Sequence, residues 1–344
     1  MSTAAAESVG APKGGASAAV LEIDDLHVTF KTEDGPVYAV RGVDLAVHES
    51  EVLGVVGESG SGKSVTMLAA MGLLPRTATI TGSVKFRGHE LLGLEQGDVR
   101  RYRGSKLAMI FQDPLTALNP VLKVGDQIAE AVLAHQEVSG NEATAKAIQM
   151  LDLVGIPQPA TRADQYPHEF SGGMRQRAMI AMAICNDPEV LIADEPTTAL
   201  DVTIQAQILE VIQEVQELTK SAVVFITHDL GVIARLATRV RVLYAGRSAE
   251  VGNVDDIFEN PGHPYTVGLM SSIPRGDGSR LRPIPGSPPN MLAPPSGCAF
   301  RPRCPYSAEI CEVEVPALRL VGKNDQLAAC HFSEQLMGHW DVEG

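Results

Sequence analysis

The hydrophobic positions of the chain form short apolar runs that alternate with amphipathic segments of helical period. Apolar runs bounded by turn residues predict strands at 21–30, 37–47, 52–56, 107–111, 190–193 and 222–226. Helices are predicted at 64–74, where Pro75 should end the helix, at 124–154 with a break at 140–141, and at 204–220. Strands that alternate with helices predict an α/β domain, and wholly apolar strands predict a buried parallel sheet.

The run GESGSGKS joins the strand at 52–56 to the next helix. It matches G-x-x-x-x-G-K-S/T in the strand–loop–helix context that a phosphate-binding loop requires. Glycines let successive backbone N–H groups point at one centre, and Lys63 and Ser64 should reach the phosphates and Mg²⁺ of a nucleoside triphosphate. The alternative is a glycine-rich turn that matches by chance. The expected nucleotide-binding residues are Gly57, Glu58, Ser59, Gly60, Ser61, Gly62, Lys63 and Ser64.

Two carboxylates, Asp194 and Glu195, follow the apolar strand at 190–193. Strand ends converge on the phosphates in nucleotide-binding sheets, so Asp194 is expected to hold Mg²⁺. Glu195 is expected to orient or deprotonate the attacking water. The alternative is that one of these acids only caps the next helix.

The segment FSGGMRQRAMIAMAI, residues 170–184, opens a predicted helix with Ser171, Gly172 and Gly173. Exposed N–H groups and the helix dipole make such a start an anion site. One chain cannot readily use a second phosphate site, because its own phosphates already occupy the first loop. We therefore expect this signature segment to face the nucleotide of a second subunit.

These motifs, together with Gln112, Asp201 and His228, resemble in their order an ATP-binding cassette (ABC) ATPase, the motor subunit of an ABC transporter. The resemblance covers roughly residues 21–252. It implies a P-loop NTPase (RecA-like) α/β cassette at 21–260 with a helical subdomain at about 113–172. It also implies ATP as the substrate, with Mg²⁺.

By this resemblance, Gln112 contacts Mg²⁺ and senses the γ-phosphate, Asp201 touches the partner across the dimer, and His228 holds the γ-phosphate beside the catalytic Glu195. The signature departs from the commonest LSGGQ form at Phe170 and Met174. Phe30 and Tyr38 flank the first turn, but no aromatic residue occupies the position at Thr32 where the family's adenine-stacking residue is expected. Phe30 is our choice for that role.

Composition narrows the choice of partners. The net charge is −14, which counts against nucleic acid as a partner because an acidic surface repels phosphate backbones. No run of eighteen apolar residues occurs, so we expect no membrane span. Residues 1–20 are rich in Ala, Ser and Gly and lack the basic start and apolar core of a signal peptide. We interpret them as a disordered cytoplasmic tail.

The chain becomes proline-rich after about residue 261, which predicts a C-terminal extension at 261–344. Four of the five cysteines fall in it, with the spacing C-x5-C-x6-C-x18-C; Cys185 lies elsewhere, in an apolar run. Four thiolates can hold one tetrahedral metal ion or one iron–sulfur cubane, although the C-x-x-C pairs typical of zinc sites are absent. Free thiols and disulfides remain alternatives. The four candidate ligands are Cys298, Cys304, Cys311 and Cys330.

This extension, including NPGHPYTVGLMSSIPR and IPGSPPNM, resembles that of dipeptide and oligopeptide importer ATPases. The resemblance implies a 4Fe–4S cluster, with Zn²⁺ as the alternative. It also implies a second, related ATPase subunit, two membrane permeases and an extracytoplasmic peptide-binding protein, with this chain peripheral at the cytoplasmic face of the plasma membrane. Nickel or glutathione import, a soluble ABC ATPase of DNA repair or translation, and a metal- or redox-sensing regulator are the alternatives. The peptides carried, the identity of the partner ATPase and the role of the cluster are left open.

Overall fold

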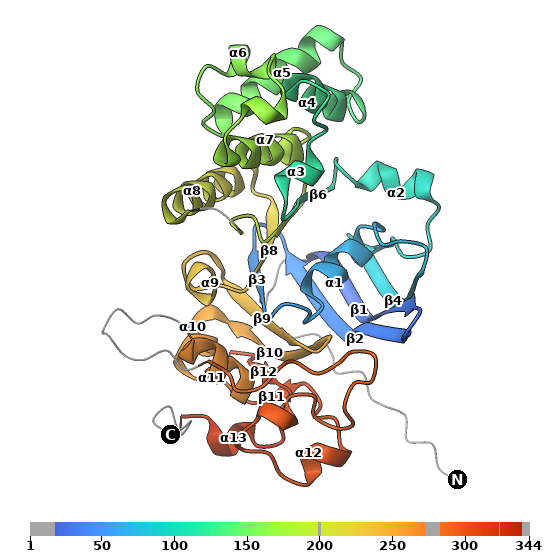
Figure 1. Ribbon diagram of the computed structural model, residues 1–344, viewed down its shortest axis with the longest axis vertical. Coiled ribbons are helices and arrows are strands. Elements are labelled where there is room, and N and C mark those ends of the chain that lie inside the picture. Colours follow the sequence, from blue (N-terminus) through green and yellow to red (C-terminus); the bar gives the residue numbers. More distant parts are fainter. Residues whose placement is uncertain (1–17, 199–200, 273–282, 323, 339–344) are drawn as a thin grey trace.

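The computed structural model describes residues 18–198, 201–272, 283–322 and 324–338, so most of the predicted N-terminal tail lies outside the described residues. Two sheets form the framework (Figure 1). The antiparallel one has the order β2-β1-β4-β5, formed by β1 (Ala19–Thr32), β2 (Gly35–His48), β4 (Ala78–Phe86) and β5 (His89–Glu90). The strands predicted at 21–30 and 37–47 are confirmed as β1 and β2.

The second sheet has eight strands in the order β11-β12-β10-β9-β3-β8-β7-β6. Its strands are β3 (Val52–Val56), β6 (Leu107–Ile110), β7 (Val190–Asp194), β8 (Ala222–Thr227), β9 (Arg239–Tyr244), β10 (Arg247–Asn253), β11 (Arg319–Leu320) and β12 (Leu327–Ala328). Strands β6, β7, β8, β3 and β9 run parallel, and every residue of β6, β7 and β8 is buried. The carboxyl ends of these parallel strands therefore meet at one edge of the sheet.

Helices surround this sheet, and α4 to α7 form a helical lobe at the top of Figure 1. The helices are α1 (Lys63–Ala70), α2 (Gln96–Tyr102), α3 (Pro114–Ala117), α4 (Val124–Leu133), α5 (Gly140–Leu153), α6 (Pro159–Ala163), α7 (Gly172–Ile184), α8 (Val202–Thr219), α9 (Leu230–Leu236), α10 (Val254–Glu259), α11 (Pro264–Ser271), α12 (Ile310–Val313) and α13 (Ser333–Leu336), with 3-10 turns η1 (Pro167–Glu169) and η2 (Arg301–Arg303). None of the described helices combines the length and apolar character needed to span a bilayer.

The end of α1 differs from the prediction that Pro75 stops the helix. The helix ends at Ala70, and Gly72 adopts a left-handed conformation with φ +62°. The N–H of Leu73 donates to the carbonyl of Leu68, and the N–H of Gly72 donates to that of Ala69. This is the hydrogen-bond pattern of a glycine C-cap, so Gly72 stops the helix before Pro75 can.

Within the terminal segment, residues 261–344, the described residues pack on the cassette and extend its sheet. Strand β12 pairs with β10, and β11 pairs with β12. Phe300 meets Tyr244 of β9 edge to face and Tyr265 meets it at a tilt, at ring-centre distances of 5.2 and 4.6 Å. All three rings belong to the same buried core as the helical lobe. Sheet and core therefore continue across the limit predicted at residue 260.

Candidate nucleotide site

The loop from Gly57 to Ser64 leaves β3 and enters α1 at the carboxyl edge of the parallel sheet. Gly57 and Gly62 have φ values of +151° and +100°, which L side chains rarely adopt. A Cβ at Gly57 would lie 2.2 Å from the carbonyl oxygen of Leu243, and one at Gly62 would lie 2.7 Å from that of Ala39. Both positions require glycine, because of conformation and close backbone approach together.

Lys63 and Ser64 start α1 and point into the loop and toward β7. The Lys63 ammonium donates to the carbonyls of Gly57 and Glu58, at 2.7 and 3.0 Å, and burial lowers its pKa. The Ser64 hydroxyl donates to the carboxylate of Asp194 at 2.8 Å, and burial raises the pKa of Asp194. A serine hydroxyl and a buried carboxylate in contact provide the hard oxygen ligands that Mg²⁺ prefers.

Glu195 lies where β7 ends, with a left-handed φ of +45° and its N–H bonded to the carbonyl of Ile226. Its carboxylate accepts hydrogen bonds from Gln112 at 3.1 Å and from Thr198 at 2.8 Å. The His228 Nδ1 lies 3.5 Å from its other oxygen. Three neighbours thus fix one carboxylate at the mouth of the loop.

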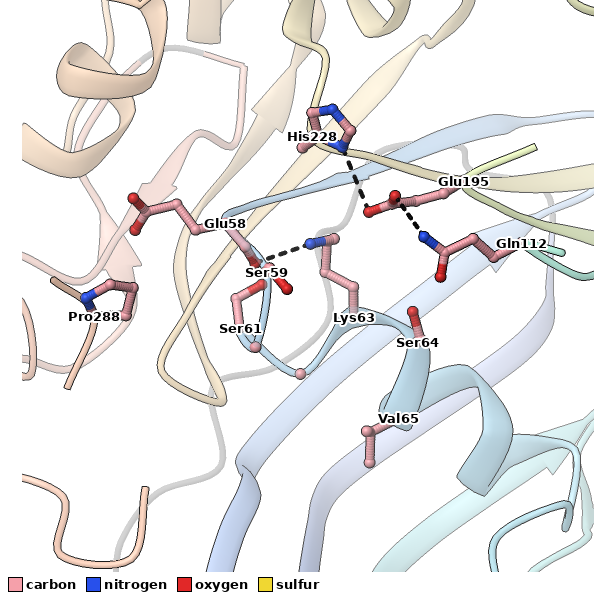
Figure 2. Close-up of a pocket in the computed structure, with 12 residues that line it drawn as sticks. Glu58, Ser59, Ser61, Lys63, Ser64, Val65, Gln112, Glu195, His228 and Pro288 are labelled. Atoms are coloured by element: carbon pink, nitrogen blue, oxygen red, sulfur yellow. Dashed lines mark hydrogen bonds and ion pairs between the residues drawn. The ribbon is translucent and has the colours of Figure 1, made fainter. Parts of the chain in front are cut away.

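These groups face a common cavity of about 690 Å³ (Figure 2). Residues 58–65 line it together with Gln112, Glu195, His228 and Pro288. The structure therefore brings together the predicted phosphate loop, Gln112, Glu195 and His228, with Asp194 joined through Ser64. Sequence reasoning missed Thr198 and Pro288. Thr198 stands three residues after Glu195 in the run DEPTT, whereas no sequence signal points to Pro288.

The other predicted nucleotide contacts are not among the residues that line this cavity. Ser171 caps α7 by accepting from the N–H of Met174 at 3.3 Å, and Asp201 caps α8 by accepting from Thr203 and Ile204. Ser171 and Gly172 are exposed, and Gly173 is half-buried. Phe30 packs against the core beneath the antiparallel sheet.

The terminal segment reaches the same site. Arg303 forms a bidentate ion pair with Glu58 of the loop, at 2.6 and 2.9 Å. The Met291 carbonyl accepts from the N–H of Tyr38 in β2 at 3.0 Å. The terminal segment therefore also contacts the hairpin formed by β1 and β2. Of the terminal segment, Pro288 borders the cavity directly, and Arg303 contacts it through Glu58.

All four cysteines of the terminal segment line one small pocket, whose wall also contains Phe300, Tyr306 and Phe332. Burial raises the pKa of the Cys298 and Cys330 thiols, and it raises that of Cys304 to about 12. Among the described residues, no three His, Cys, Asp or Glu side chains are gathered closely enough to hold a metal ion. The sulfurs share a pocket but do not close around a single ion.

Comparison with known proteins places these features in a family. The sequence profile of ABC transporters matches residues 40–198, and that of the oligopeptide/dipeptide transporter C-terminal region matches residues 249–311. The dipeptide transport ATP-binding protein DppD of Bacillus subtilis is 50% identical over 94% of this chain and 98% of its own length. This chain belongs to the ABC transporter family.

Another ABC relative, the oligopeptide transport ATP-binding protein OppD of Escherichia coli, is 49% identical over 87% of this chain and 89% of its own length. A solved dimeric structure of MJ0796, a bacterial ABC transporter cassette, superimposes with a TM-score of 0.61 at 26% identity, covering 68% of this chain and 98% of that one. The predicted ABC cassette fold is thus confirmed.

Proposed function

We propose that this chain is the ATP-hydrolysing motor subunit of a bacterial importer of dipeptides or oligopeptides. The observation that carries the proposal is the convergence of the phosphate loop, the Ser64–Asp194 pair and Glu195 on one cavity. The peptide substrate is inferred from the dipeptide and oligopeptide transport proteins to which the chain is similar over most of its length.

In the proposed reaction, the loop N–H groups and Lys63 bind the β- and γ-phosphates of ATP. Ser64, Asp194 and Gln112 would hold Mg²⁺, which would neutralise charge on the phosphates. Glu195 accepts the proton of the attacking water as general base, while His228 orients the γ-phosphate. Gln112 and Thr198 hold Glu195 in place through their hydrogen bonds.

A second cassette completes the proposed site. Ser171, Gly172 and Gly173 would cover the nucleotide bound by the partner ATPase subunit, and Asp201 would touch that partner. ATP bound between two surfaces favours the closed pair, and hydrolysis releases it, because a ligand shifts an equilibrium only through differential affinity. The closing motion would drive two membrane permeases, supplied with peptide by an extracytoplasmic binding protein. The chain would then lie at the cytoplasmic face of the membrane. Phe30 as the adenine-stacking residue stays a prediction.

The four cysteines are proposed to hold a 4Fe–4S cluster within a small terminal module at 261–344. Four cysteines in one pocket, two of them buried and two partly buried, match the ligand set of a cubane, and the aromatic residues of the pocket wall would shield such a cluster. Zinc would need its four sulfurs at about 2.3 Å from one centre, a closer gathering than these thiols have. A structural role follows from the position of the pocket between segments that have no long helix or strand of their own.

Reconstitution tests the function. The chain, its partner ATPase and the permeases in lipid vesicles should accumulate a labelled oligopeptide only with ATP and the binding protein. Glu195→Gln in this chain should abolish uptake while leaving ATP bound. Uptake of nickel or glutathione instead of peptide would support the alternative cargo, and co-purification with nucleic acid in place of permeases would support a soluble repair or translation ATPase. The comparisons favour neither alternative.

A further inference from the structure

A buried arginine of the terminal segment reaches across the fold to the phosphate loop. Arg303 ends the turn η2, directly before Cys304, and its side chain is only 3% exposed. Its two terminal nitrogens lie 2.6 and 2.9 Å from the two carboxylate oxygens of Glu58, which is 245 residues away in the sequence. Two parallel hydrogen bonds of this kind fix the orientation of the Glu58 carboxylate and also pair its charge with that of the guanidinium.

The guanidinium of Arg303 has an acceptor for each of its five N–H groups. Besides Glu58, these are the carbonyls of Pro285 at 2.8 Å and Ile284 at 3.4 Å and the hydroxyl of Tyr244 at 3.4 Å. The group also lies 6.0 Å from the ring centre of Phe300. The position of Arg303 is therefore set by the terminal segment and not by Glu58 alone.

Glu58 is held from a second direction. Its backbone N–H donates to the Tyr265 hydroxyl at 2.7 Å, and Tyr265 is fully buried in α11. Its carbonyl accepts from Lys63 inside the loop. In Figure 2 the Glu58 carboxylate points away from Lys63, on the side of the loop where Pro288 lies. The terminal segment thus draws a negative charge away from the space that phosphates would occupy.

We propose that Arg303 is a positioning residue for the phosphate loop: it neutralises Glu58 and ties the loop to the four-cysteine pocket. Without Arg303, an unpaired carboxylate would stand at the mouth of the loop and repel the triphosphate. The inference rests on the proposed nucleotide site and adds that the terminal segment sets its affinity for ATP.

The variant Arg303→Met tests this role, because methionine retains much of the buried side-chain volume without the guanidinium. The dissociation constant for ATP, measured by calorimetric titration of the full chain, should rise roughly tenfold, as expected for leaving one charge unpaired. In the assembled transporter the KM for ATP should rise with it, whereas kcat at saturating ATP should stay within about threefold. Arg301→Met, in the same turn but without a contact to the loop, is the matched control and should bind ATP as the wild type does.

A double variant separates positioning from a purely structural effect. Glu58→Gln combined with Arg303→Met removes both charges, so most of the lost affinity should return. Equal weakness of the single and double variants would overturn the proposal, because Arg303 would then act through the fold and not through Glu58. Binding by Arg303→Met within twofold of the wild type would also overturn it.

Glu58→Lys tests the proposal if Arg303→Met does not fold. Because the Glu58 side chain is partly exposed, this substitution should be tolerated by the fold. An added positive charge alone would tighten ATP binding, whereas repulsion between Lys and Arg303 should displace the loop and weaken it. Unchanged or tighter binding contradicts the proposal. A wild-type chain that binds no ATP would instead contradict the nucleotide site itself.

Discussion

The nucleotide cavity and the four-cysteine pocket are two sites prepared in opposite ways. In the cavity, several polar groups already satisfy one another: Lys63 bonds to loop carbonyls, Ser64 to Asp194, and Gln112 to Glu195. In the pocket, the cysteines lie beside aromatic rings, and burial raises the pKa of the Cys298, Cys304 and Cys330 thiols.

The difference concerns what a ligand must contribute. ATP would exchange existing hydrogen bonds for new ones, so its binding would not have to create the order of the cavity. A metal group would have to deprotonate the thiols and bind them together, so its binding energy becomes folding energy of the terminal segment. On the two proposals, ATP would bind and leave, whereas a metal group would stay bound.

The largest expected effect lies in the cavity. Glu195→Gln keeps the shape of the side chain but removes the acceptor for the water proton. ATP hydrolysis should fall by a factor on the order of 10² to 10⁴. ATP should still bind, and an ATP-bound dimer should accumulate in size-exclusion chromatography. Turnover within a few-fold of the wild type would remove Glu195 from the mechanism.

Lys63→Ala tests whether the cavity depends on groups already in place. The ammonium that now bonds to Gly57 and Glu58 would be lost, together with its contact to the phosphates. The ATP dissociation constant should rise roughly tenfold to a hundredfold, the range for a charged hydrogen bond. Normal ATP binding, measured with a fluorescent analogue, would show that the phosphates lie elsewhere.

Cys304→Ser tests whether the four-cysteine pocket holds an iron–sulfur cluster. Anaerobically purified wild-type protein should be brown and contain about four irons per chain, and the variant should lose most of them. Cys185→Ser is the control, because Cys185 follows α7 and is not among the residues lining the pocket. One zinc per colourless chain would replace the cluster but keep the site. Four freely reactive thiols in folded, metal-free protein would contradict both.

The smallest expected effect concerns Glu250, which links strand β10 of the cassette to the terminal segment. Glu250 of β10 is fully buried and accepts from Gly262, His263 and Gln326, and burial raises its pKa to about 7. A raised pKa stabilises the folded state fully below pH 4.5, and this contribution is lost as the pH rises through 7.

The test compares the wild type with Glu250→Gln, in which this titration is absent. The stability of the variant relative to the wild type, from chemical denaturation, should increase between pH 5 and pH 8, by at most about 3 kcal/mol. Absolute stabilities matter less here, because the amide cannot accept all the same hydrogen bonds. A difference that is constant with pH would show that Glu250 is ionised throughout.

The cassette was predictable because its signals are local. The run from Gly57 to Ser64 requires glycines at fixed offsets, and the segments 190–193 of β7 and 222–226 of β8 are short, wholly apolar runs. The end of α1 was predicted wrongly because Pro75 is the more conspicuous signal, although Gly72 supplies the left-handed turn first. Both the phosphate loop and the end of α1 are determined by residues close to them in the sequence.

The terminal segment was less predictable because its contacts are long-range. Strands β11 and β12 have two residues each, too few for any hydrophobic period. The contact of Arg303 with Glu58 joins residues that are 245 positions apart, and the sequence offers no signal for it. The spacing of the cysteines predicted a shared site, but not the aromatic wall around it.

The pairing of β12 with β10 has a further consequence for solubility. β12 pairs with Glu250 and Val251 of the seven-residue strand β10, and without β12 this part of the edge would offer free N–H and carbonyl groups to another chain. The sheet instead ends at β11, which is too short to act as a template for another strand. A chain truncated after β10 would expose an unpaired strand edge. We expect such a chain to aggregate even though its phosphate loop is intact.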